Sequence, residues 1–204
     1  ADVRAAAVAA MGKDDLELLV EVAEGDNEAE IRRSAIDKIQ DPATLARVAE
    51  KQDSDKLRKH ATKLAVEMWV AKAIASTDED EAREAFNGAA NHGSDRDMAE
   101  IAGQAQLPEL RSKALSRLQD QKALGQVVRK SKRPEEWQLA LERIEDLAVL
   151  RSIAVDEKRK EVAVAALDRI EDEDTLADIS SKAKVKSVRT RAKKAKNALA
   201  KKKQ

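Results

Sequence analysis

Five arginines lie at one position of a spaced pattern, three residues before an alanine, where they could bind phosphates or carboxylates. They are Arg4, Arg32, Arg58, Arg111 and Arg189. Guanidinium groups bind both anions in bidentate geometry, so an unbroken row would receive an anionic ligand. Trp137 and Ala163 take the arginine position in two further copies and interrupt the row. We therefore expect a structural ladder, in which each arginine pairs with the helix-capping aspartate of the preceding unit, as Arg58 would with Asp41.

A strongly basic stretch ends the chain. Eleven of the 39 basic residues lie in residues 182–204, which hold no acid, so the other 28 basic and 39 acidic residues give residues 1–181 a net charge of −11. If this stretch binds nucleic acid, we expect the contacts to involve Lys186, Arg189, Arg191, Lys193 and Lys194, with salt-dependent affinity. It has no aromatic residue for base stacking, so a solvated or capping helix is the favoured interpretation.

The chain offers few groups for catalysis. It has no cysteine, which excludes disulfides and thiolate chemistry. His60 and His92 lie in different copies of the pattern without recognised acid or metal partners, and no glycine-rich phosphate loop occurs. We expect no catalytic residue, no metal and no cofactor.

Recurring alanines define the elements that must position these side chains. They lie 24 to 29 residues apart, at Ala7, Ala35, Ala61, Ala85, Ala114, Ala140, Ala166 and Ala192. Apolar residues one and four positions later complete a helical stripe in most copies. A fixed period near 26 residues indicates a helical repeat array, and the scarcity of aromatic residues (1%) argues against strands.

An aspartate then separates two helical segments in each regular copy. These residues are Asp41, Asp120, Asp146 and Asp172, with Glu67 in the third copy. Aspartate is a preferred residue at helix starts, because its carboxylate accepts backbone N–H groups that have no other partner. Each copy is thus a pair of helices of about ten residues, too short to be stable alone, so the pairs must stack.

The expected fold is all-α: a single right-handed α-solenoid over residues 1–204, with about seven and a half helix pairs. Residues 57–109 should be irregular, because Leu57 to Ala75 has no turn signal and reads as one helix. Asp97 should cap the next regular helix, and residues 182–204 should form a basic C-terminal helix. The chain begins inside a copy of the pattern, which suggests a piece of a longer protein.

The pattern resembles known helical repeats. Ile31, Arg32, Ala35, Asp41 and the Leu45–Ala49 segment, with their copies, resemble the HEAT-like superfamily, bacterial type, and are similar to the leucine-rich-repeat variant. The resemblance implies an armadillo-type superhelix with a ladder of Arg and Asp between units. It also implies that the exposed side of the second helices is the concave, partner-binding face. Some HEAT-like proteins are enzymes acting on DNA or cofactors, which keeps an enzyme as an implied alternative.

Candidate contacts with a protein partner come from that face and from the two tryptophans. Arg47, Gln126 and Arg129 lie along the second helices, and Trp69 and Trp137 are residue types enriched at the centres of interfaces. Trp137 occupies the arginine position, which would leave it partly exposed and makes it the first choice for a contact residue, but core or inter-repeat packing is favoured for both tryptophans. The rows are chemically mixed, which favours a protein partner over a repetitive ligand.

The function predicted from sequence is a non-enzymatic protein-interaction scaffold, with a nucleic-acid-binding module as the alternative. No apolar run approaches the ~20 residues that span a bilayer, and no signal peptide is recognisable, so we expect a cytoplasmic protein without membrane contact. The partner's identity does not follow from the sequence.

Overall fold

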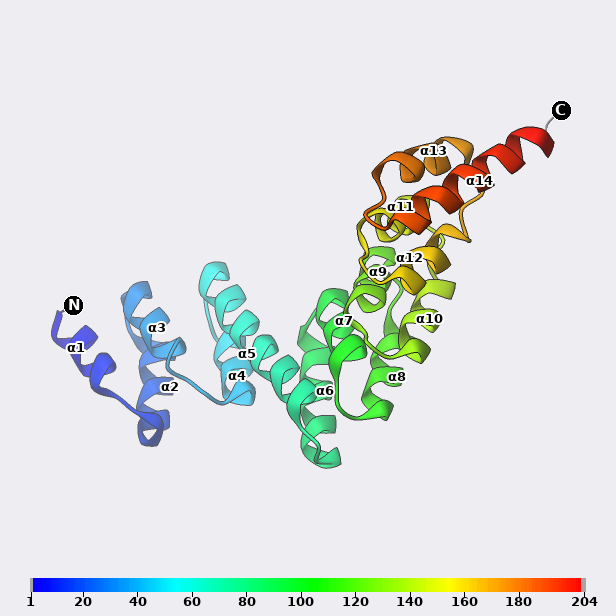
Figure 1. The fold of residues 1–204 in the computed structure, drawn as a ribbon. Helices are drawn as coiled ribbons and strands as arrows, with labels where there is room; N and C mark the ends of the chain where they lie inside the picture. Colours follow the sequence, from blue (N-terminus) through cyan, green and yellow to red (C-terminus); the bar gives the residue numbers. More distant parts are fainter. Residues whose placement is uncertain (1, 203–204) are drawn as a thin grey trace. The chain divides into compact units, whose positions relative to one another are not determined.

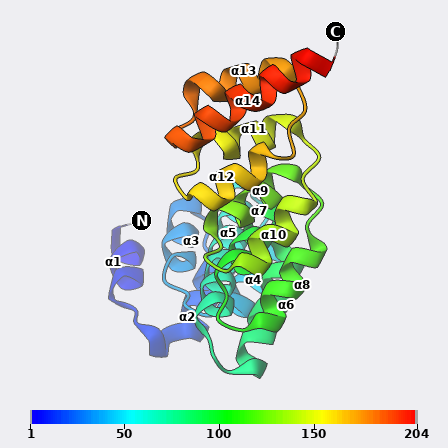
Figure 2. The ribbon, with the colours of Figure 1, turned by 45° about the vertical axis from the view of Figure 1, so that its right-hand side comes forward.

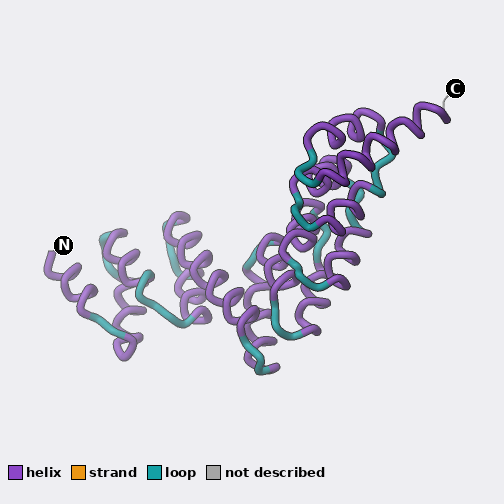
Figure 3. The backbone as a smooth tube through the Cα atoms, viewed as in Figure 1, coloured by secondary structure: helices purple, strands orange, loops and turns teal. Residues whose placement is uncertain are grey.

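The computed structural model describes residues 2–202, and the part of the chain that it describes contains only helices and loops (Figure 3). The helices are α1 (Asp2–Ala10), η1 (Lys13–Asp15), α2 (Leu16–Gly25), α3 (Ala29–Ile36), α4 (Pro42–Glu50), α5 (Asp55–Ala75), α6 (Glu79–His92), α7 (Asp95–Gln104), α8 (Pro108–Arg117), α9 (Gln121–Lys130), α10 (Pro134–Glu142), α11 (Leu147–Asp156), α12 (Lys160–Leu167), α13 (Glu173–Lys182) and α14 (Lys186–Lys202). The all-α fold class is therefore confirmed. None of these helices is both long and apolar enough to cross a membrane.

The chain divides into two compact units, one up to Asp97 and the other from Met98. In the first unit α3 packs against α1 and α5, and α4 packs against α2 (Figure 1). In the second unit α9, α11 and α13 form one row. The other row contains α8, which packs on α10, and α12, which packs on α14 (Figures 1 and 2). Each unit is thus built from neighbouring helix pairs. A single solenoid over residues 1–204 stays a prediction.

The predicted helix caps are confirmed. Asp41, Asp120, Asp146 and Asp172 each immediately precede a helix, and each carboxylate accepts a backbone N–H two or three residues later at 2.7 Å. Because the first N–H groups of a helix have no partner within it, these bonds fix where each second helix begins.

The third copy departs from the pattern, as expected. α5 runs unbroken for 21 residues from Asp55 to Ala75, which confirms the single long helix. The expected cap at Glu67 is wrong, because Glu67 lies in the middle of this helix and is exposed. The sequence there offers neither a proline nor an aspartate to end one helix and start another, so the two helices of the pair are fused.

Helix α7 begins earlier than predicted. α7 starts at Asp95, so Ser94 holds the position before the helix, and Asp97 lies inside its first turn. The Asp97 carboxylate reaches back and accepts both the backbone N–H and the hydroxyl of Ser94, each at 2.7 Å. Asp97 therefore stabilises the helix start as the acidic partner in a capping box rather than as the cap itself.

The recurring alanines lie at the contacts between helix pairs. Seven of them are at most 1% exposed, and they are Ala35, Ala61, Ala85, Ala114, Ala140, Ala166 and Ala192. Ala7 is exposed, since its helix α1 is the first element described. A small side chain at this point lets successive first helices approach closely, with Leu, Ile and Val side chains filling the space beside it.

Arginines of the predicted ladder bind backbone carbonyls, which corrects the expected pairing with capping aspartates. Four of the five guanidinium groups donate to the carbonyl oxygen six residues earlier, just after the preceding helix ends: Arg32 to Asp26 (3.3 Å), Arg58 to Gln52 (2.8 Å), Arg111 to Ala105 (3.0 Å) and Arg189 to Ala183. Arg4 instead pairs with the carboxylates of Asp26 (2.9 Å) and Glu28 (2.7 Å). The last carbonyls of a helix have no partner within it, and positive charge is favourable there. These four arginines therefore cap the ends of the second helices.

Arg58 and Asp41 show why the expected pairing is wrong. Asp41 uses its carboxylate to cap α4, accepting the N–H of Thr44. Arg58 instead pairs with Asp55 in the first turn of its own helix, at 2.6 Å. Each side chain is already satisfied by the terminus of a helix, so neither needs the other.

A second set of basic residues, missed from the sequence, joins successive first helices. These residues lie three positions after the recurring alanine, and each donates to carbonyls at the end of the preceding first helix: Lys38 to Ala9 (2.6 Å) and Met11 (2.7 Å), Arg143 to Leu115 (2.7 Å), and Arg169 to Leu141. The signal is present as a recurring Lys or Arg at that position. The neighbouring helix pairs are thus connected through main-chain carbonyls as well as through apolar packing.

Arg159 caps the end of α9, because Trp137 stands at the arginine position of that copy and has no guanidinium group. Ser131 lies six residues before Trp137, where the other copies have a carbonyl bound by arginine. Arg159, at the start of α12, donates to the carbonyls of Ser131 and Val128, both at 2.6 Å. The end of α9 is therefore capped from the start of α12, two helix pairs further along the chain.

Candidate functional site: a cationic groove between α12 and α14

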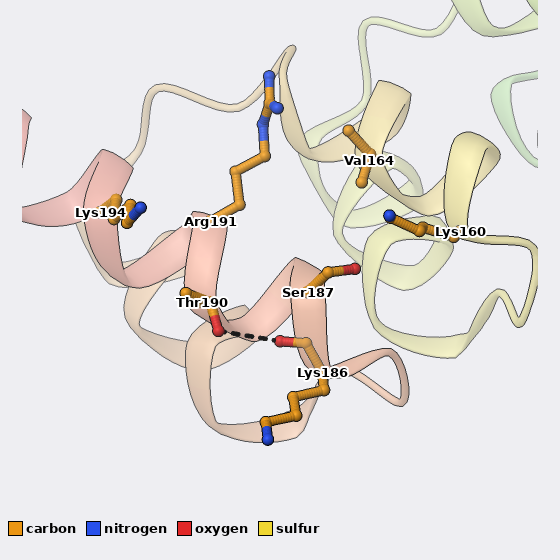
Figure 4. Close-up of a pocket in the computed structure, with 7 residues that line it drawn as sticks. All are labelled: Lys160, Val164, Lys186, Ser187, Thr190, Arg191 and Lys194. Atoms are coloured by element: carbon orange, nitrogen blue, oxygen red, sulfur yellow. Dashed lines mark hydrogen bonds between the residues drawn. The ribbon is translucent and has the colours of Figure 1, made fainter.

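A groove of about 760 Å³ lies in the second unit between α12 and α14 (Figure 4). Its lining residues come from these two helices, and they are Lys160, Val164, Lys186, Ser187, Thr190, Arg191 and Lys194. Four of the seven are cationic. The groove therefore overlaps the basic stretch singled out from the sequence.

Helical spacing places these side chains on one side of α14. Val188 and Ala192, four residues apart, are fully buried and face α12 and α13. Lys186, Thr190 and Lys194 recur at the same interval on a neighbouring face, which opens onto the groove. Figure 4 shows the Thr190 hydroxyl donating to the Lys186 carbonyl (3.2 Å), so that hydroxyl is already partnered within the helix.

The α12 side contributes Lys160 and Val164, which are also four residues apart. Figure 4 shows Lys160 directed across the groove toward Ser187. Val164 is partly buried and supplies an apolar surface between the charged groups. The groove therefore combines an aliphatic patch with ammonium groups around it.

Arg191 is held by a carboxylate at one edge of the groove. Its Nε and Nη2 donate to the two oxygens of Asp168, each at 2.7 Å, in a bidentate pair. Within residues 2–202, Lys160, Lys186 and Lys194 form no ion pair. Three lysines without an ion pair thus line the groove and only Arg191 is neutralised, by Asp168, which leaves the lining with net positive charge.

Glu157 and Arg159 fix the start of α12 and hence Lys160. The backbone N–H of Arg159 donates to Glu157 Oε1 (2.9 Å), and its Nη2 pairs with Glu157 Oε2 (3.0 Å). Burial raises the pKa of Glu157, but the hydrogen bonds and charge of Arg159 lower it more, so the pKa lies below the ordinary value of 4.5. The carboxylate is therefore bound in its charged form.

This depressed pKa predicts an acid-dependent loss of stability that the variant Glu157→Gln will lack. A carboxyl group with a lower pKa in the folded state adds stability above its unfolded pKa, and that stability is lost as the pH falls through the folded pKa. Between about pH 5 and about pH 3, the wild type should therefore lose more of its free energy of unfolding than the variant. Urea denaturation at both pH values measures this. Equal losses in the two proteins would show that Glu157 is not stabilised as a carboxylate.

Three of the five predicted nucleic-acid contacts line the groove, namely Lys186, Arg191 and Lys194. Arg189 does not, because its guanidinium donates to the carbonyls that follow α13. Lys193 is exposed on α14 but is not among the lining residues. Lys160 was missed, because only the packing of α12 against α14 brings it beside the basic stretch.

Both tryptophans are buried, which confirms the packing favoured for them and corrects the idea that the arginine position would leave Trp137 partly exposed. Trp137 is 7% exposed and Trp69 is 8% exposed. The arginine position that Trp137 occupies faces the preceding helix, and even Arg111 at that position is only 6% exposed. Trp69 stacks on the ring of His92, with centroids 5.3 Å apart. Neither tryptophan offers a free face to a partner.

The predicted contacts on the second helices separate into two places. Gln126 and Arg129 share a groove of about 340 Å³ between α9 and α11, where Arg129 Nη2 donates to Ser152 Oγ (2.9 Å). This groove is smaller than the one between α12 and α14. Arg47 is exposed on α4, in the other compact unit.

A third groove, of about 310 Å³, lies in the first unit between α3 and α5. Arg33, Lys56, Lys59 and Lys63 line it, together with His60, which contacts the Asp37 carboxylate at 2.5 Å. In the repeating pattern His60 and Asp37 hold the positions of Arg191 and Asp168. The two grooves are therefore built at the same positions of the pattern.

The described residues contain no cluster of three or more histidine, aspartate or glutamate side chains placed to hold a metal ion. The polar groups of the groove between α12 and α14 are ammonium, guanidinium and hydroxyl, whereas the two smaller grooves also contain the carboxylates of Glu30 and Asp146. The chemistry of the groove between α12 and α14 suits the binding of an anionic group.

No family model and no curated protein matches the chain. One solved structure, described as "Computational Design of Self-Assembling Cyclic Protein Homooligomers", is similar over 98% of this chain and 81% of its own, with 16% identity and a TM-score of 0.20. Similarity at that level carries no argument about fold or function. The resemblance to HEAT-like repeats stays a prediction.

Proposed function

We propose that this chain is a non-enzymatic protein-interaction module, in which stacked helix pairs of a right-handed α-solenoid present grooves to a partner. The sequence period of about 26 residues supports the solenoid. So do the recurring aspartate caps and the basic residues that join each helix to the end of another.

The observation that carries the proposal is that α12, one wall of the groove, is held at both ends by bonds to other helix pairs. α12 is fixed at its start by Arg159, bound to the carbonyls of Ser131 and Val128, and near its end by Arg169, bound to the carbonyl of Leu141. A surface that is already ordered loses little conformational entropy when a partner binds. Such a frame suits the recognition of a partner that fits between helices.

Nucleic-acid binding is the second candidate, because Lys160, Lys186, Arg191 and Lys194 meet in one groove. Phosphate contacts by these residues would make binding strongly dependent on salt. The groove lining includes no aromatic side chain on which a base could stack, which favours the protein-binding proposal.

Affinity capture with the full chain separates the two candidates. The chain is immobilised and exposed to an extract of the cells that produce it, with and without nuclease treatment. We expect a defined protein to be retained in both samples and to bind the purified chain directly. Recovery of nucleic acid alone, or loss of every protein after nuclease treatment, would contradict the proposal.

A further inference from the structure

We infer that the groove between α12 and α14 binds an acidic, partly apolar segment of a partner protein. This inference rests on the proposed function and names the kind of partner. Lys160, Lys186 and Lys194 supply charge for carboxylates, while Val164 and the methyl group of Thr190 supply apolar surface between them. A segment that alternates acidic and aliphatic side chains matches both features.

The positive charge of this groove is not required by the fold. The same positions between α10 and α12 hold Pro134, Gln138, Lys160, Glu161, Val164, Ala165 and Asp168. That set carries two acids and one base, whereas the groove between α12 and α14 carries four bases. Helices therefore pack in the same register without four cations at these positions, so the packing does not require them.

The groove between α3 and α5 lies at the same positions of the pattern and is also rich in cations. Arg33, Lys56, Lys59 and Lys63 line it together with Glu30, and only Lys63 matches a lysine of the other groove, Lys194. Two grooves with an excess of cations, beside the one between α10 and α12 with an excess of acids, indicate that positive charge is concentrated at particular grooves.

The bond between Arg191 and Asp168 shows that a carboxylate fits this surface. Both carboxylate oxygens are bound, each at 2.7 Å, by a side chain that lines the groove. Arg191 and Asp168 are both substantially exposed, so exchange with a carboxylate from a partner is sterically open. An acidic partner segment would extend this chemistry to the three lysines that have no ion pair within the described residues.

The arrangement suits a short protein segment better than a nucleic-acid strand. A sugar-phosphate backbone needs positive charge along its path, but Glu161 and Asp168 on α12 interrupt the path toward α10. The single arginine of the groove is already paired with Asp168. The surface that favours an acidic ligand is therefore confined to the groove between α12 and α14.

Binding of a labelled peptide tests the inference. The probe is a fluorescein-labelled peptide with the triplet Glu-Glu-Leu repeated four times, at about 0.15 M salt. All proteins carry Lys59→Gln and Lys63→Gln, so that the groove between α3 and α5 contributes little. The comparison peptide has Gln in place of Glu, and a labelled oligothymidylate of similar length tests nucleic-acid binding.

We expect the variant Lys186→Gln/Lys194→Gln to bind the acidic peptide at least about tenfold more weakly than its parent, by fluorescence anisotropy. The matched control Lys193→Gln/Lys201→Gln removes the same charge from α14 outside the groove lining, and it should change the affinity by less than about twofold. The Gln peptide should bind much more weakly than the Glu peptide.

Equal losses in the two variants would show attraction to net charge alone and overturn the inference. It is also overturned if the peptide does not bind, or if the oligothymidylate binds more tightly and depends on Lys186 and Lys194. A captured partner that still binds the Lys186→Gln/Lys194→Gln protein would refute this site and leave the proposed function standing. Failure to capture any protein would instead refute the proposed function.

Discussion

Replacing Arg111 with alanine will lower the free energy of unfolding by about 3–5 kcal/mol, because the change leaves a buried carboxylate without its partner. Arg111 is 6% exposed, and its Nε donates to Glu136 Oε1 at 2.6 Å. Its Nη1 also donates to the carbonyls of Ala105 (3.0 Å) and Gln106 (2.7 Å). The variant therefore loses an ion pair and two caps on the end of α7 together.

The exposed arginine Arg58 provides the matched control. Arg58→Ala removes the same side chain from the same position of the pattern, but its ion pair with Asp55 is solvated, so the loss should be about 1 kcal/mol or less. Urea denaturation followed by circular dichroism measures both losses. A double-mutant cycle of Arg111→Ala with Glu136→Ala should give a coupling above about 1 kcal/mol. Similar losses for Arg111→Ala and Arg58→Ala would contradict this account of the buried pair.

Replacing Gly88 with alanine will destabilise the first unit by about 1–3 kcal/mol through overpacking. A Cβ atom at Gly88 would collide with the indole ring of Trp69, so α5 and α6 could not keep their present distance. Alanine normally favours a helix over glycine by about 1 kcal/mol, so a loss here reports the collision rather than helix propensity.

Gly25→Ala is the matched control for this prediction. Gly25 is also helical, at the end of α2, and a Cβ atom there would have no atom within 4 Å. That variant should be neutral or slightly stabilising. The two are compared by urea denaturation in a Trp137→Phe background, where fluorescence reports Trp69 alone. A Gly88→Ala protein as stable as Gly25→Ala, with unchanged emission, would show that Trp69 does not pack on Gly88.

The helix pairs could be predicted from the sequence because their signals are local. An aspartate before a helix and an alanine on its inner face act within one turn, and four of the five predicted aspartate caps are present. The fused helix α5 was predictable for the same reason, since its sequence has no residue that favours a break.

The partners of the arginines could not be predicted, because they are main-chain atoms. A carbonyl group is present at every residue, so the sequence carries no mark of which one is free. Charge alone pairs Arg58 with Asp41, whereas the unpaired carbonyls at the end of α4 lie nearer to it. The burial of Trp137 could not be inferred from its position either, because Arg111 is buried at that position whereas Arg58 is exposed.

The sequence allowed only some of the residues that line the candidate site to be predicted. Lys186, Arg191 and Lys194 belong to a basic stretch that composition reveals, whereas Lys160 and Val164 join them only through the packing of α12 on α14. Separating Arg189 from these residues also required the structure, because its position on α14 turns it toward the carbonyls that follow α13.

Chemical-shift mapping of the acidic peptide on the isotopically labelled 22.4 kDa chain tests the central claim most directly. The account predicts that the amide and side-chain signals that move belong mainly to α12 and α14, including those of Lys160, Val164, Lys186 and Lys194. Movement confined to α9 and α11, around Gln126 and Arg129, would contradict it, as would an unchanged spectrum at saturating peptide.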